Sequence, residues 1–211
     1  MKSTLFIAAL FAVFAVCAQD REFPDYRSKN DIFTRIREKE IRDDVATFSM
    51  GGIEEIIGKL PLKSLPVTGY GADYISFGGN GMEVLIKAER FDPTKHKLSY
   101  YENKHLVRID NKAYFGDYGK VPRTAIQSVS VITGRDTIRV PQAAFADIFN
   151  PIFTYSEGGV NKSHNSVYLS ADGRRIYVYM LKPESGGSYE VTWVIQDKKY
   201  VRRVVDFGFL R

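Results

Sequence analysis

Cysteine is nearly absent from this sequence, and so are long apolar segments. Cys17 is the only cysteine, which excludes an internal disulfide and any zinc site that requires several thiolates. The longest apolar run, residues 5–16, has twelve residues, whereas a membrane-spanning helix needs about 20. A chain of 211 residues is long enough to be stabilised by a buried core instead.

The first eighteen residues have the pattern of a secretory signal peptide. Lys2 gives a positive start, the apolar run follows, and small residues at its end suit cleavage after Ala18. A lipoprotein signal with lipidated Cys17 is the alternative, and it fits less well because Val16 precedes the cysteine. We therefore expect residues 1–18 to be removed, and a secreted or periplasmic bacterial protein to remain, without a transmembrane helix.

Charge of one sign is not concentrated anywhere in the chain. There are 30 lysines and arginines against 25 aspartates and glutamates, and the two signs are interspersed, as on an ordinary solvated surface. A nucleic-acid-binding face requires clustered basic residues. The sequence therefore predicts no nucleic-acid partner.

Motifs for catalysis, metals and cofactors are also missing. His96, His105 and His164 do not have the short spacing of zinc ligands, and a nucleophile elbow of the form G-x-S-x-G does not occur. Residues 78–81 are glycine-rich, but they precede a predicted strand, so we interpret them as a turn and not as a phosphate loop. The sequence predicts no catalytic residue, metal ligand or cofactor.

A helical period is present near the N-terminus, in residues 30–48. Phe33, Ile36, Ile41, Val45 and Phe48 recur at helical spacing with charged residues between them. Prolines and glycines follow, up to residue 71. We expect residues 19–71 to form a helical annex, with an amphipathic helix, and a linker.

Strand patterns separated by turns fill residues 72–211, the predicted β-rich domain. The strands are expected in residues 82–91, 97–101, 105–109, 113–115, 126–132, 137–140, 167–169, 176–181, 188–196 and 200–207. Turn sequences such as Asp110-Asn111 and residues 171–174 join them, and residues 141–149 suggest one short helix or crossover. Consecutive hairpins predict a mainly β fold, all-β or α+β, with an antiparallel, sandwich-like sheet.

The last hairpin shows the clearest alternation. Residues 189, 191, 193 and 195 are apolar or aromatic, and the residues between them are polar apart from Val194. This alternation predicts one buried face and one face in water. Arg202 and Arg203 are neighbours on the next strand, so we expect them to point to opposite sides.

Aromatic and basic residues on the last two hairpins are the candidate binding residues. The aromatic candidates are Tyr177, Tyr179, Tyr189 and Trp193, and the basic candidates are Arg174, Arg175, Lys198 and Lys199. Aromatic rings stack on sugars and proteins, and the two basic pairs are expected at one end of the sheet. The competing interpretation, which we favour, is that the aromatic residues are ordinary strand residues and that the basic residues are solvated turn positions.

Three functions remain open from these patterns. The first is an exported, non-catalytic binding or structural module whose partner is a glycan, an envelope lipid or another exported protein. The second is a secreted carbohydrate-active hydrolase, which needs two carboxylates about 5–10 Å apart across a cleft. The third is a small outer-membrane barrel, which the short strands and the charged N-terminal helix disfavour.

Overall fold

Two five-stranded antiparallel sheets form the body of the protein. The computed structural model describes residues 32–55, 60–184 and 186–207, so the expected signal peptide lies outside the described residues. The first sheet contains, in spatial order, β1 (Lys63–Leu65), β11 (Ser166–Leu169), β12 (Arg175–Lys182), β13 (Tyr189–Gln196) and β14 (Lys199–Phe207). The second contains β2 (Val67–Tyr70), β3 (Tyr74–Gly79), β4 (Met82–Arg90), β7 (Thr124–Thr133) and β8 (Asp136–Arg139).

Two small hairpins and several short helices complete the described structure. The hairpins pair β5 (Leu98–Tyr101) with β6 (His105–Ile109), and β9 (Tyr155–Glu157) with β10 (Val160–Lys162). The helices are η2 (Phe33–Arg35), α1 (Lys39–Val45), η3 (Met50–Glu55), η4 (Pro93–Lys95) and η5 (Gln142–Ala144). Residues 141–149, where a short helix or crossover was expected, contain η5, which covers three of these residues.

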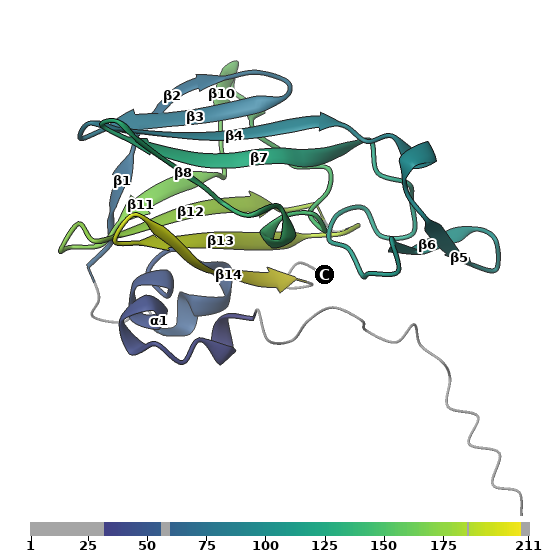
Figure 1. Ribbon diagram of the computed structural model, residues 1–211, viewed down its shortest axis with the longest axis horizontal. Coiled ribbons are helices and arrows are strands. Elements are labelled where there is room, and N and C mark those ends of the chain that lie inside the picture. Colours follow the sequence, from purple (N-terminus) through teal and green to yellow (C-terminus); the bar gives the residue numbers. More distant parts are fainter. Residues whose placement is uncertain (1–31, 56–59, 185, 208–211) are drawn as a thin grey trace, which may run out of the picture.

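The two sheets pack face to face around one hydrophobic core (Figure 1). Ile75, Val84 and Val131 enter it from the second sheet, and Val178 and Trp193 enter it from the first. All five side chains are almost fully buried. The prediction of a mainly β fold with antiparallel hairpins in a sandwich-like arrangement is confirmed.

Turn chemistry explains much of the strand connectivity. Asp110 and Asn111 have φ angles of 52° and 62°, so the turn lies where the sequence predicted it. The strand expected in residues 113–115 is not formed, and isolated bridges at Lys112 and Phe115 take its place. Asp197 and Lys198 have φ angles of 49° and 62° and connect β13 to β14 in the same way. Such a turn requires left-handed backbone at both central residues, which aspartate and asparagine tolerate well.

Residues 32–55, which we call the N-terminal segment, form a third layer on the outer face of the first sheet (Figure 1). Phe33, Ile36, Ile41 and Val45 are all buried there, as their helical spacing suggested. An amphipathic helix, α1, is present, but it is shorter than the helical spacing of residues 30–48 suggests, because residues 36–38 are not helical and separate η2 from α1. Helices this short depend on tertiary packing for their stability.

The prediction that one face of the last hairpin lies in water is also wrong. Glu190, Thr192 and Val194 are each at most 3% exposed, because the N-terminal segment covers them. Val194 packs with Tyr177 and Val204 in a second hydrophobic cluster beneath that segment. Its apolar character at a predicted polar position was the sequence signal for this cover.

The predicted linker up to residue 71 is not simply a linker. It contains β1, which pairs with β11, and β2, which pairs with β3. Pro66 lies between these two strands, each of which is at the edge of its sheet. Prolines are tolerated next to short edge strands because the free edge needs no ladder hydrogen bond there. At Pro66 the chain passes from the first sheet to the second.

Candidate anion-binding site

The four aromatic candidates from the last two hairpins do not form an exposed surface. Trp193 and Tyr189 are fully buried; the indole N–H of Trp193 donates to the carbonyl of Ala144 at 2.8 Å, and the Tyr189 hydroxyl donates to the carbonyl of Phe149 at 3.2 Å. Both residues belong to the core between the sheets. The polar atoms of both side chains have hydrogen-bond partners inside the fold. These two residues therefore pack the core and do not form a binding surface.

The other two aromatic candidates lie beneath the N-terminal segment. Tyr177 donates to the Asp44 carboxylate at 2.5 Å, and Tyr179 donates to the Glu190 carboxylate at 2.9 Å. Burial is the main cause that raises the pKa of both phenols, and the adjacent carboxylates raise it further. These tyrosines therefore hold the third layer against the sheet and present no ring to solvent.

The basic candidates do gather at one end of the first sheet, where most of them meet carboxylates. Arg174 forms two hydrogen bonds to Asp197, at 2.9 and 2.7 Å, which links the two hairpin turns. Arg175 is 9% exposed and contacts Glu40 and Asp44 of the N-terminal segment. This compensation leaves little positive charge for a ligand.

The remaining two basic candidates lie at the turn between β13 and β14. Lys198 forms an ion pair with Asp136 at 2.6 Å, and Lys199 is exposed at the start of β14. The pair therefore adds one compensated and one exposed charge to this end of the sheet.

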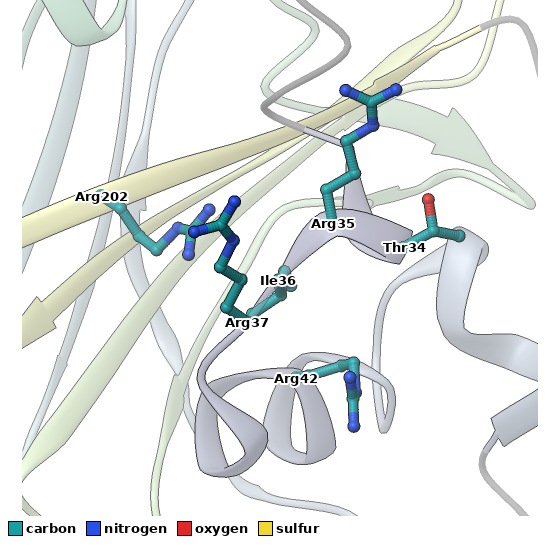
Figure 2. A pocket seen from close by; sticks show the side chains of 6 residues that line it. All are labelled: Thr34, Arg35, Ile36, Arg37, Arg42 and Arg202. Carbon is teal, nitrogen blue, oxygen red and sulfur yellow. The ribbon is translucent and has the colours of Figure 1, made fainter.

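A cavity lined by arginines lies elsewhere, between the N-terminal segment and β14. It has a volume of about 580 Å³ and is lined by Thr34, Arg35, Ile36, Arg37, Arg42 and Arg202. We call it the arginine-lined cavity. Figure 2 shows that the guanidinium groups of Arg37 and Arg202 point toward one another, whereas Arg35 and Arg42 extend to opposite sides. Two like charges thus face the same space.

A β-bulge in β14 determines that the Arg202 side chain faces the arginine-lined cavity. Val194 pairs with Arg202 and Ile195 with Tyr200, so Val201 is an extra residue in β14. Arg202 consequently lies on the side of the N-terminal segment, where it forms an ion pair with Glu38. Arg203 points to the other side and contacts Asp147 at 2.8 Å, which confirms the expectation that these two arginines face opposite sides.

Hydrogen bonding in the arginine-lined cavity is incomplete. The Nε atom of Arg202 is buried and has no hydrogen-bond partner among the residues that the structure describes. In the part of the chain that the structure describes, no hydrogen bond or ion pair engages the guanidinium group of Arg37 or that of Arg42. Glu38 is therefore the carboxylate that compensates Arg202, while Arg37 and Arg42 keep their charge available to a ligand.

A second cavity of about 390 Å³ adjoins the first at Arg202. Its lining includes Pro141, Ala143 and Ala144 together with residues 200–203. Glu38 also lines this cavity and pairs with Arg202, and Arg203 is compensated by Asp147. The remaining lining side chains are small or apolar, apart from Tyr200. The second cavity thus extends the site along β14 without adding free positive charge.

Among the described residues that line the two cavities, there is no pair of carboxylates suited to glycoside hydrolysis. Glu190 and Asp206 are cross-strand neighbours, but Glu190 is 3% exposed and its two carboxylate oxygens accept hydrogen bonds from the backbone N–H groups of Met50 and Gly51. Burial raises the pKa of both carboxyls. Glu190 lies beneath the N-terminal segment, whereas Asp206 is partly exposed, so the two carboxylates do not face each other across an open cleft.

Sequence reasoning did not find the arginine-lined cavity, because its residues come from two distant parts of the chain. Arg37 and Arg42 are each followed by an acidic residue in the sequence, and Arg202 follows about 160 residues later. The available signal was the apolar residue Val194, which indicated that another segment covers this side of the sheet.

Within the described residues, no helix has both the length and the apolar character that crossing a membrane requires.

Comparison with known proteins adds no functional information. No protein-family model, no curated protein and no solved structure matches this chain.

Proposed function

We propose that this protein is an exported, non-catalytic binding module and that its arginine-lined cavity binds an anionic group of the ligand. The observation that carries this proposal is the convergence of Arg37 and Arg202 on one space, with one carboxylate, Glu38, between the N-terminal segment and β14. Guanidinium groups form paired hydrogen bonds with carboxylates, phosphates and sulfates. An anion between them offsets their mutual repulsion.

Export is part of the proposal and rests on the signal-peptide pattern of residues 1–18. A glycan, an envelope lipid or another exported protein that carries an acidic group fits this location. A hydrolase is less well supported, because the carboxylate neighbours Glu190 and Asp206 do not face each other across an open cleft. Mass spectrometry of the secreted protein, with Gln19 as its first residue, tests the export step.

Thermal unfolding in the presence of inorganic phosphate tests the binding step. Phosphate at ten times its dissociation constant stabilises the native state by about 1.4 kcal/mol, which raises Tm by about 3–6 °C for a chain of this size. The reference is sodium chloride at equal ionic strength. We expect Arg37→Ala to remove this increase, because it removes one of the two converging guanidinium groups. The exposed Arg37 side chain forms no hydrogen bond or ion pair with the described residues, so the variant should remain folded.

Arg90→Ala is the matched control for this experiment. Arg90 is exposed at the end of β4 in the second sheet, and its loss changes net charge equally. An equal response to phosphate in the wild type, Arg37→Ala and Arg90→Ala would show that the effect is one of general charge. The proposal would then be wrong.

A further inference from the structure

Three tyrosines are exposed on one projecting part of the molecule. Tyr100, Tyr101 and Tyr118 expose 44%, 46% and 47% of their surface. The first two lie on β5, and Tyr118 lies in the loop beside β6, where the N–H of Leu106 donates to the carbonyl of Gly119 at 3.0 Å. We call the β5–β6 hairpin with residues 117–120 the tyrosine lobe. Figure 1 shows its hairpin at one end of the sandwich.

A buried tyrosine holds the lobe in one shape. The Tyr114 hydroxyl accepts a hydrogen bond from the N–H of Gly119 at 3.2 Å and lies 3.1 Å from the carbonyl of Leu106. Burial raises the pKa of Tyr114 to about 12, so this hydroxyl stays protonated at neutral pH. The N–H of Tyr118 donates to the carbonyl of Gly186 at 2.9 Å. Exposed rings on a fixed backbone lose little conformational entropy when they bind.

Two lysines and one glutamate lie near these rings in the chain; the glutamate, Glu102, is exposed and directly follows Tyr101. Lys104 and Lys120 are exposed, and within the described residues neither forms a hydrogen bond or ion pair through its ammonium group. Lys104 belongs to the turn that follows Tyr101, and its N–H donates to the Tyr101 carbonyl at 3.0 Å. Lys120 lies two residues after Tyr118. Each lysine is therefore close in the chain to an exposed tyrosine.

We infer that the tyrosine lobe binds an acidic polysaccharide. The apolar faces of sugar rings stack on aromatic rings, and the two ammonium groups attract carboxylates on the sugars. The lobe shares no residue with the arginine-lined cavity, so this inference stands independently of the proposed function.

A protein partner fits this surface less well. A protein interface has an apolar core that is removed from water. Within residues 98–121, all of which the structure describes, Val121 is the only large apolar side chain besides the three tyrosines that is exposed. Rings with polar tips and neighbouring lysines suit a hydrated, charged chain of sugars better.

Affinity for polygalacturonate, with neutral dextran as the comparison polymer, tests the inference. The experiment uses isothermal titration calorimetry on the mature chain. We expect polygalacturonate to bind and dextran to bind at least tenfold more weakly. Tyr118→Ala should reduce the affinity for polygalacturonate about tenfold, whereas Tyr118→Phe keeps the ring and should retain most of it. Lys104→Gln with Lys120→Gln should weaken binding and reduce its dependence on salt.

Tyr70→Ala is the matched control, because Tyr70 is 46% exposed on β2, outside the lobe. Its affinity should equal that of the wild type. Circular dichroism checks that each variant is folded, and Tyr100→Ala replaces Tyr118→Ala if the latter does not fold. The inference is overturned if polygalacturonate does not bind, or if the lobe variants bind it as tightly as the wild type. It is also overturned if Arg37→Ala is the only variant that abolishes the binding of polygalacturonate.

Discussion

The Glu190 carboxylate accepts a hydrogen bond from the backbone N–H of Gly51 at 2.9 Å, across 139 residues of sequence. The same carboxylate accepts from the N–H of Met50 at 2.8 Å and from the Tyr179 hydroxyl at 2.9 Å. Three donors thus converge on one buried acid, and they join the N-terminal segment to the centre of the first sheet.

The buried position of Glu190 predicts an unusual pH dependence. Burial is the main cause that raises the pKa of Glu190 above 4.5, and the neighbouring Asp206 also raises it. An acid whose folded-state pKa is raised stabilises the fold below its unfolded-state pKa, and this contribution is lost as pH rises through the folded-state pKa. Glu190→Gln keeps an acceptor and removes the charge. We expect the free energy of unfolding of Glu190→Gln, relative to wild type, to increase from pH 4.5 upward.

Urea denaturation at several pH values measures this difference. Asp206→Asn is the companion variant, because burial raises the pKa of Asp206 as well. A constant difference between wild type and Glu190→Gln across pH 4.5–8 would contradict the expected coupling between this carboxyl and folding.

Asp110 should show the opposite sign. A hydrogen bond from His96, at 2.7 Å, is the main cause that lowers the pKa of Asp110, and the N–H of Lys97 contributes. A lowered folded-state pKa gives stability above the unfolded-state pKa, and this stability is lost as pH falls through the folded-state pKa. Asp110→Asn tolerates the positive φ of 52°. We expect it to be less stable than wild type at pH 7 and equally stable near pH 2, as measured by urea denaturation.

Gly187 and Gly186 form a matched pair for a steric prediction. A Cβ atom at residue 187 would lie 1.6 Å from the carbonyl oxygen of Gly116, and its φ of +152° is unfavourable for other residues. A Cβ atom at residue 186 meets nothing within 4 Å. We expect Gly187→Ala to cost about 3 kcal/mol or more in unfolding free energy and Gly186→Ala less than about 1 kcal/mol. Similar thermal midpoints for the two variants would show that these loops do not approach as described.

Local sequence signals predicted the hairpins, because their causes are local. The turn at Asp110-Asn111 depends on residues that tolerate positive φ, and the alternation around Trp193 depends on the period of a strand. The third layer was harder to predict, because Val194 and Glu190 are covered by a segment about 140 residues earlier. A polar residue at a strand position suggests solvent, and only its partners show that it is buried.

The arginine-lined cavity depends on two features that no short window contains. The bulge at Val201 determines which side Arg202 faces, and the extended residues 36–38 place Arg37 opposite it. The exposed tyrosines were also not selected from the sequence: Tyr100 and Tyr118 are exposed, whereas the selected Tyr177 and Tyr189 are buried. Burial separates these two groups, and burial is decided by tertiary packing.

The most direct test of the proposed binding site observes its arginines themselves. In ¹⁵N-edited NMR spectra, the Nε–Hε signals of Arg37 and Arg202 are followed while inorganic sulfate is added at constant ionic strength. Both signals should shift along one saturable curve while the signal of Arg90 stays in place. Shifts at Arg37 and Arg202 no larger than that of Arg90, without saturation, would contradict an anion site between the N-terminal segment and β14.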